Sequence, residues 1–130
     1  MKKFLKTSLL ILSLFILVGC GAPKLSEDFK EEELKSSVEE IIDDFNNEKY
    51  EDIVLRGSEE IQAQLTADQL EQAWNTVRKD LGAYKELSKV AYTEKDDIAT
   101  VIAIAKYENK KIQFTISYDK DMNLCGIYMK

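Results

Sequence analysis

The residues that could do chemistry in this chain are carboxylates, tyrosines and two cysteines, because the sequence contains no histidine. Without histidine, a serine or cysteine nucleophile lacks the base that usually activates it, and the commonest transition-metal ligand is missing. Acidic residues occur in close groups at 31–33, 43–44, 59–60 and 96–97. A carboxylate pair can perform acid–base catalysis where its surroundings separate the two pKa values, but adjacent residues seldom share a face. We interpret these groups as solvated surface.

A second candidate is the run of Asp119, Asp121 and Asn123, which has the opening spacing of a calcium-binding loop. The later positions of such a loop do not match. Leu124 stands where a glycine makes the sharp turn, and Lys130 stands where a bidentate glutamate is needed. We therefore expect a polar hairpin turn in this segment and no metal site.

Aromatic residues are the remaining candidates for a site. They are Trp74, Tyr84, Tyr118 and Tyr128, followed by Tyr92 and Tyr107. Helices packed on a sheet can enclose an apolar cavity, and such rings would give it apolar walls with polar tips. The alternative is ordinary packing, because tyrosine is a common strand residue and Trp74 lies on the apolar stripe of a predicted helix. We favour packing and keep the ligand pocket as the alternative.

The N-terminal segment has a different character. Three lysines precede an apolar run over 9–18, which is about half as long as a membrane-spanning helix requires. The sequence Leu-Val-Gly-Cys at 17–20 resembles the lipobox of bacterial lipoproteins. The resemblance implies that a diacylglyceryl group is attached to the Cys20 thiol and that a signal peptidase cleaves between Gly19 and Cys20. Residues 1–19 are then a signal peptide, and the protein is held at the extracytoplasmic face of the cell membrane.

The segment after the signal peptide is strongly acidic, since removal of the three lysines changes the formal charge from −6 to −9. An acidic surface repels nucleic-acid phosphates and anionic lipid headgroups, so we expect no nucleic-acid partner unless a basic face is separated from the acidic one. Cys125 has no disulfide partner once Cys20 carries the lipid, and a lone thiol on a strand is usually a small buried hydrophobe. The lipid on Cys20 is the only cofactor expected.

The helices that must position any site come first in the chain. Residues 20–30 are expected to form an anchor and tether, and 31–130 a single domain. Apolar residues recur at helical spacing over 34–45, and two shorter helices are predicted around 50–57 and after 58.

The clearest helix begins at a capping box that is formed by Thr66 and Gln69. Its apolar stripe runs from Leu70 to Leu81, and Gly82 is expected to end it, because glycine favours the C-terminal position of a helix.

Four strands are predicted after this helix, over 84–92, 98–107, 112–118 and 124–129. Their short polar connections require antiparallel hairpins. Segment 98–107 is apolar on both faces, so it should be an inner strand. The expected fold is α+β, with N-terminal helices packed on one face of a curved four-stranded antiparallel sheet.

A family resemblance covers roughly residues 34–129. The features that carry it are an amphipathic helix, the Asn-Glu-Lys-Tyr step that ends at Tyr50, the Leu65-Thr66 helix start, Trp74, Leu81-Gly82-Ala83-Tyr84, and the closing Tyr118-Asp-Lys-Asp and Gly126-Ile-Tyr128 segments. This pattern resembles the bacterial family known as domain of unknown function 3887, which is similar to cystatin-like and nuclear-transport-factor-like folds. The resemblance implies that fold and brings no catalytic residues with it.

Three functional hypotheses follow from the sequence. The leading one is a membrane-anchored, non-catalytic binding or interaction module that engages a protein partner or a small apolar ligand. One alternative is an enzyme that uses tyrosine, aspartate or glutamate as acid–base groups in a small cavity. The other is an acidic inhibitor or immunity-type protein that blocks a basic partner, and its binding would weaken with added salt.

Overall fold

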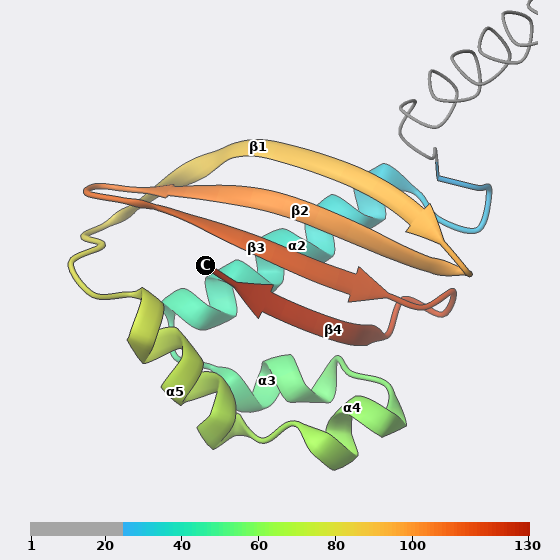
Figure 1. Cartoon of the computed structure of the whole chain (residues 1–130), viewed down its shortest axis with the longest axis horizontal. Coiled ribbons are helices and arrows are strands. Elements are labelled where there is room, and N and C mark those ends of the chain that lie inside the picture. Colours follow the sequence, from blue (N-terminus) through green and yellow to red (C-terminus); the bar gives the residue numbers. More distant parts are fainter. Residues whose placement is uncertain (1–24) are drawn as a thin grey trace, which may run out of the picture.

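The computed structural model describes residues 25–130, and within this range four helices precede four strands (Figure 1). The helices are α2 (Glu31–Asn46), α3 (Tyr50–Leu55), α4 (Glu59–Gln64) and α5 (Ala67–Val77). The strands are β1 (Tyr84–Lys95), β2 (Ile98–Tyr107), β3 (Lys111–Tyr118) and β4 (Leu124–Met129). The predicted α+β class is confirmed. The predicted signal peptide and the predicted lipidation site at Cys20 lie outside the described residues.

Local signals in the sequence set the starts of two helices. The Ser58 hydroxyl accepts a hydrogen bond from the Ile61 amide at 3.3 Å and caps α4. The capping box at α5 is complete, because the Gln69 amide donates to the Thr66 hydroxyl at 3.1 Å and the Thr66 amide donates to the Gln69 side chain at 3.0 Å. Both caps satisfy backbone donors that a helix N-terminus leaves without partners.

The end of α5 differs from the prediction, because the helix stops at Val77 and does not continue to Leu81. Leu81 is buried in the connecting loop, where its amide donates to the Arg78 carbonyl at 3.3 Å. Gly82 has a φ of +75° and makes the turn into β1 instead of ending the helix. The prediction was wrong because helical spacing of a buried residue does not require helical backbone.

The sheet is a simple antiparallel meander in the order β1-β2-β3-β4, as predicted. β1 extends three residues beyond the predicted end, because Asp96 and Asp97 alone form the connection to β2. Their φ values of +52° and +65° are those of a two-residue hairpin turn. β2 is an inner strand, with Val101 and Ala103 fully buried against the helices and Ile102 half-buried on the opposite face.

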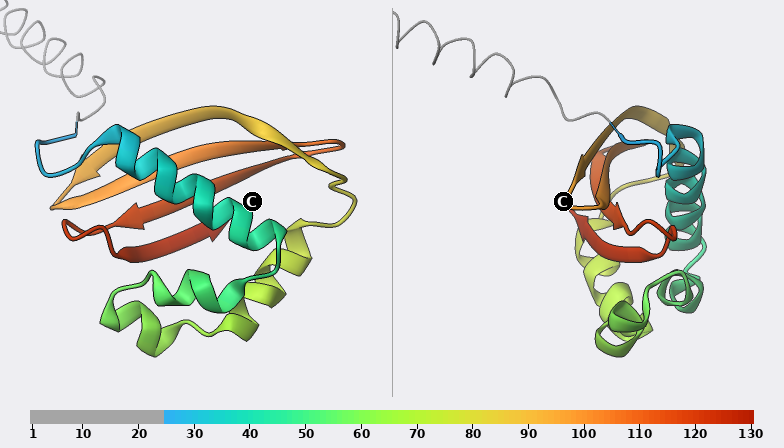
Figure 2. Two further views of the ribbon diagram at one scale, coloured as in Figure 1. Left: turned by 180° about the vertical axis from the view of Figure 1, so that it is seen from behind. Right: turned by 90° about the vertical axis from the view of Figure 1, so that its right-hand side faces the viewer.

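Helix α2 crosses the inner face of the sheet, while α3, α4 and α5 lie beside the β4 edge (Figure 2). The core between these layers is built around stacked aromatic rings. Phe45 of α2 lies 5.1 Å from the Trp74 ring of α5 and 5.8 Å from the Phe114 ring of β3, as measured between ring centroids. Burial of each such side chain stabilises the fold by about 1.5–3 kcal/mol.

Two tyrosines connect the sheet to α2 through their hydroxyl groups. The Tyr118 hydroxyl donates to the Ser37 hydroxyl at 2.8 Å, and the Tyr107 hydroxyl donates to the Asn46 side-chain oxygen. These bonds satisfy polar groups that would otherwise be buried without partners.

The packed domain begins before residue 31. Phe29 is only 5% exposed and Leu25 packs against the core, so residues before 31 contribute to the packed domain. The Ser26 amide donates to the Glu94 carboxylate at 2.7 Å, which places the start of the described chain beside the β1–β2 hairpin. Among residues 25–130, no helix is long and apolar enough to cross a membrane.

Candidate functional site

The aromatic residues that the sequence singled out do not come together in one cavity. Trp74 and Tyr118 are buried in the core, whereas the side chains of Tyr84 and Tyr128 are 39% and 62% exposed. Tyr84 packs edge-on against Tyr107 at one end of the sheet, with ring centroids 5.3 Å apart. Aromatic side chains, Trp74 among them, pack in the space between the helices and the sheet.

The buried tyrosines are hydrogen-bond donors and not bases. Burial raises the pKa of Tyr118 to about 12, although its hydrogen bond to Ser37 opposes the shift. Burial also raises the pKa of Tyr107, and the hydrogen bond to Asn46 again opposes it. Half-buried Tyr92 has a raised pKa for the same reason. At neutral pH all three hydroxyls therefore keep their protons.

The polar run at 119–123 forms the predicted hairpin turn. One Asp119 carboxylate oxygen accepts from the Asp121 amide at 3.0 Å and from the Asn123 amide at 2.9 Å. The neighbouring Cys125 is half-buried, and burial followed by the charge of Asp119 raises the pKa of its thiol. Such a thiol is a weak nucleophile, because the thiolate is the reactive form.

Arg56 forms a cluster with two carboxylates between α2 and the end of α3. Its guanidinium lies 2.8 Å from Glu40 and 3.4 Å from Asp44. Asp44 is buried, and the loss of hydration raises its pKa, while Arg56 works in the opposite direction. The cluster is satisfied internally, so we interpret it as a structural contact between the two helices.

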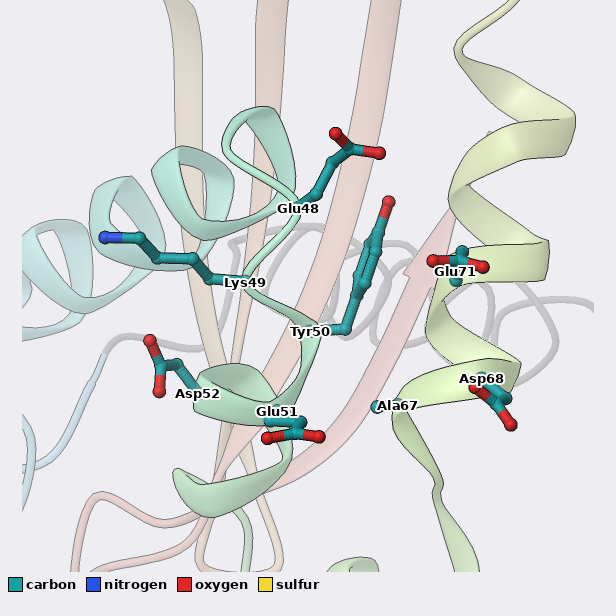
Figure 3. Close-up of a pocket in the computed structure, with 8 residues that line it drawn as sticks. All are labelled: Glu48, Lys49, Tyr50, Glu51, Asp52, Ala67, Asp68 and Glu71. Atoms are coloured by element: carbon teal, nitrogen blue, oxygen red, sulfur yellow. The ribbon is translucent and has the colours of Figure 1, made fainter.

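An acidic pocket lies where the α2–α3 turn and α3 meet the first half of α5 (Figure 3). It has a volume of about 380 Å³. Its lining residues are Glu48, Lys49, Tyr50, Glu51, Asp52, Ala67, Asp68 and Glu71. Five carboxylates and one ammonium group therefore line the pocket, and its formal charge is negative. The Lys49 side chain extends away from the pocket, whereas the Arg78 guanidinium lies 3.4 Å from the Glu48 carboxylate.

Local backbone geometry places these residues. Glu48 adopts a left-handed φ of +58° directly after α2, and the Lys49 amide donates to the Asp44 carbonyl at 2.7 Å. This turn makes Tyr50 the first residue of α3 and sets its ring edge-on to Phe45, with centroids 6.3 Å apart. The opposite wall begins at the capped first turn of α5, where a helix N-terminus favours the negative charge of an acidic residue.

The Tyr50 side chain is the unusual feature of the pocket. It is 6% exposed, and its hydroxyl has no hydrogen-bond partner among residues 25–130. Figure 3 shows the ring standing between Glu48 and Glu71. Burial raises the pKa of this hydroxyl, Arg78 lowers it, and the two glutamates raise it further. A buried hydroxyl without a partner costs about 1–3 kcal/mol, which a ligand could recover.

An apolar hollow adjoins the acidic pocket. It is lined by Glu51, Val54, Leu55 and Ala67, and it shares Glu51 and Ala67 with the pocket. Leu55 is 69% exposed, which is unusual for a large aliphatic side chain. Negative charge and apolar surface thus form one continuous region, which we call the helical corner and define by Glu48, Tyr50, Glu51, Leu55, Asp68 and Glu71.

The helical corner was not predicted from the sequence. The acidic groups considered there lie elsewhere, and Tyr50 had been placed only as part of a short helix. Two signals were present, namely the run Glu48-Lys-Tyr-Glu-Asp52 and the pair Asp68 and Glu71, whose spacing of three puts both on one helical face. The contact between α3 and α5 that joins these segments depends on the tertiary structure.

Comparison with known proteins agrees with the resemblance inferred from the sequence. The model of the family described as "Protein of unknown function (DUF3887)" matches residues 38–127, a range that includes the helical corner and all four strands up to Ile127. An NMR structure of a protein from Ruminococcus gnavus ATCC 29149 is similar, with a TM-score of 0.70 and 28% identity over 83% of this chain and 97% of that chain. No curated protein matches the sequence.

Proposed function

Since this chain belongs to the DUF3887 family of proteins of unknown function, we propose a function from its own residues: a membrane-anchored lipoprotein that binds a basic, partly apolar segment of a protein partner. In this proposal the protein catalyses no reaction. The lipobox-like Leu-Val-Gly-Cys at 17–20 supports the anchor, and two acyl chains are sufficient for stable attachment to a bilayer.

The anchor can be tested with Cys20→Ala in the native host. We expect the wild-type protein in the membrane fraction, with an intact mass that shows loss of residues 1–19 and gain of the lipid. Cys20→Ala should lose both the lipid and the cleavage, while Cys125→Ala, the matched control, should behave as wild type. An unchanged mass for Cys20→Ala in the membrane fraction would refute the anchor.

The observation that carries the binding proposal is the Tyr50 hydroxyl, which has no hydrogen-bond partner among residues 25–130 and whose ring stands between Glu48 and Glu71. A lysine ammonium has three donors and no acceptor, so it can donate to the hydroxyl oxygen and to the carboxylates of Glu48 and Glu71 together. The aromatic ring adds attraction for a cation near its face.

The neighbouring apolar hollow supports a protein segment over a free small cation. A partner that presents a lysine to the pocket can place an aliphatic side chain against Leu55, and exposed apolar surface rimmed by charge is typical of interaction sites. The same chemistry fits the inhibitor or immunity-type hypothesis, in which an acidic protein captures a basic partner.

The non-catalytic role is supported by the protonation of the buried tyrosines. Tyr50, Tyr107 and Tyr118 all have raised pKa values, and a general base must be deprotonated near the working pH. The absence of histidine from the sequence removes the usual substitute.

The pocket can be tested with the mature lipidated protein in neutral detergent micelles, using cadaverine as a mimic of a lysine side chain. We expect NMR shifts of the Glu51 and Asp68 amides and a binding constant that falls as salt is added. The double variant Tyr50→Phe/Glu71→Gln should bind about fivefold more weakly, because it loses one hydroxyl contact and one charge.

The control is Tyr84→Phe/Glu86→Gln, which makes the same two chemical changes on β1. Equal weakening by both double variants, or none by the first, would show that cadaverine binds elsewhere. A lysyl-leucine amide should bind more tightly than cadaverine, and Leu55→Ala should remove that advantage. If Leu55→Ala leaves the difference unchanged, the apolar hollow takes no part.

A further inference from the structure

Charge is unevenly distributed between the two halves of the domain. Residues 25–83, which include all four described helices, contain 17 acidic and 6 basic side chains. Residues 84–130, which form the sheet, contain 7 acidic and 8 basic side chains. The sequence analysis allowed for a basic face separated from the acidic surface, and the sheet is where such a face can form.

The strand register identifies that face. Lysines occupy outward positions on all strands or at their ends, since they pair with residues that point away from the helices. They are Lys89, Lys95, Lys106, Lys111 and Lys130, all exposed. None of these five lysines forms an ion pair within residues 25–130. The strand register places one acidic residue, Glu86, on the same face, opposite Lys106. We call this surface the outer sheet face.

Between the lysines, the outer sheet face is apolar and hydroxyl-bearing. Ile102 and Ile104 are half-buried beside Thr115, and Tyr128 projects with 62% exposure opposite Thr115. Lysines around a tyrosine and aliphatic side chains are suited to the polar boundary of a membrane, where aromatic rings sit among headgroups and lysines extend to phosphates. Figure 2 shows that no helix covers this side of the sheet within the described chain.

If Cys20 carries the proposed lipid anchor, the position of Leu25 places the domain close to the bilayer. Leu25 is five residues after Cys20, so an extended connection spans at most about 18 Å. The domain is therefore held close enough for one of its faces to meet the headgroups. The helical side is repelled by an anionic surface, whereas the outer sheet face is attracted to it.

We infer that the outer sheet face docks on the anionic lipid surface to which the chain is anchored. In this orientation the acidic helical corner lies beside the β4 edge and outside the docked face, available to a basic partner. The predicted repulsion between the acidic domain and anionic headgroups thus applies to the helical side alone.

The test uses the mature lipidated protein, reconstituted into vesicles of phosphatidylcholine alone or of two parts phosphatidylcholine to one part phosphatidylglycerol. Lysine acetylation rates are read by mass spectrometry. We expect Lys89, Lys106, Lys111 and Lys130 to react at least threefold more slowly on the anionic vesicles. Lys35 and Lys49, exposed on the helical side, should react equally on both, and high salt should remove the protection.

A charge variant provides the matched control. Replacement of Lys89, Lys106, Lys111 and Lys130 by glutamine should abolish the protection of Lys95. Replacement of Lys30, Lys35, Lys49 and Lys79 by glutamine removes the same charge from the helical side and should leave that protection intact.

Sedimentation of the same samples separates this inference from the anchor. Sedimentation with both vesicles and equal labelling would overturn docking while the anchor stands. Sedimentation with anionic vesicles alone, with protection, would support docking and refute the anchor, and sedimentation with neither would refute both. Protection of these lysines could instead depend on the amount of protein per vesicle and not on lipid charge. That result would show that a second copy of the chain covers the outer sheet face, and it would overturn the inference.

Discussion

The helical side and the outer sheet face belong to one acidic chain, yet they present opposite chemistry to their surroundings. Acidic residues gather at helix starts and on solvent-facing helix positions, while lysines lie along outward strand positions. A net charge of −6 describes neither surface. The net charge of a chain therefore does not exclude a class of partner. Only the charge of the face that would contact the partner can exclude it.

The inward surfaces of the two layers, by contrast, are alike. Both contribute aromatic and aliphatic side chains to one core, in which Trp74 of α5 lies 6.0 Å from Phe114 of β3 between ring centroids. The helices and the sheet therefore differ only in their solvent-facing side chains. Substitutions in the shared core and on each exposed surface can test this difference separately.

The largest effect is expected for Trp74→Ala. Truncation of this buried ring should reduce the free energy of unfolding by about 3–5 kcal/mol, since it leaves a cavity between the layers. Tyr128→Ala, on the outer sheet face, should change it by less than about 1 kcal/mol. Urea denaturation of both variants measures the contrast, and equal losses would make Tyr128 a structural residue and weaken its assignment to a docking surface.

A smaller, pH-dependent effect is expected for Arg56→Gln. The pKa of Asp44 is raised above 3.8 in the folded state, so protonation favours folding and its contribution is lost as pH rises through the folded pKa. Without Arg56, which lowers that pKa, Asp44 must ionise in a buried position with less compensation. The variant should lose about 1–2 kcal/mol at pH 7 and less below pH 3.8.

The control for this prediction is Asp44→Asn, measured by urea denaturation across the same pH range. In the wild-type background, the loss of stability caused by Arg56→Gln should shrink as the pH falls. In the Asp44→Asn background, that loss should depend less on pH, because only the Glu40 carboxylate then remains beside Arg56. A difference that persists unchanged at acid pH in the wild-type background would show that Arg56 stabilises the fold through packing alone.

Local signals predicted much of this fold, whereas the site depends on tertiary contacts. Ser58 and Thr66 capped the helices that they were expected to cap, and alternation along 112–118 gave β3 its buried face, because such preferences act within a few residues. The predicted end of α5 at Leu81 was wrong, because a loop residue can be buried in the core at helical spacing from the preceding helix. Tyr50 could not be assigned, since its surroundings come from two helices separated in sequence.

Thr66→Ala should have a moderate effect that links stability to the site. The substitution removes the hydrogen bond that the Gln69 amide donates to the Thr66 hydroxyl and should cost about 1 kcal/mol. Ala67 and Asp68, which line the acidic pocket, follow Thr66 directly. Cadaverine binding should therefore weaken when the cap is lost. The control is Ser58→Ala, which uncaps α4 and should reduce stability without weakening binding; the opposite pattern would separate the pocket from α5.

The smallest effects are expected for single surface charges. Glu51→Gln on the helical side should raise the free energy of unfolding slightly at low salt, because it relieves repulsion among carboxylates. Lys106→Gln on the outer sheet face should change it by less than about 0.5 kcal/mol. Thermal melts at low and high salt would show the contrast, and a larger loss for Lys106→Gln would indicate that the lysine has a structural role.

The hydrogen bonds from Tyr118 to Ser37 and from Tyr107 to Asn46 have a mechanical consequence. They hold α2 to the sheet at two points nine residues apart, or about 13.5 Å along the helix axis. A pull along that axis on the N-terminal end of α2 would load both bonds and the whole apolar stripe in shear at once. The helix would resist such a force as a unit, whereas a strand peeled from an edge yields one bond at a time.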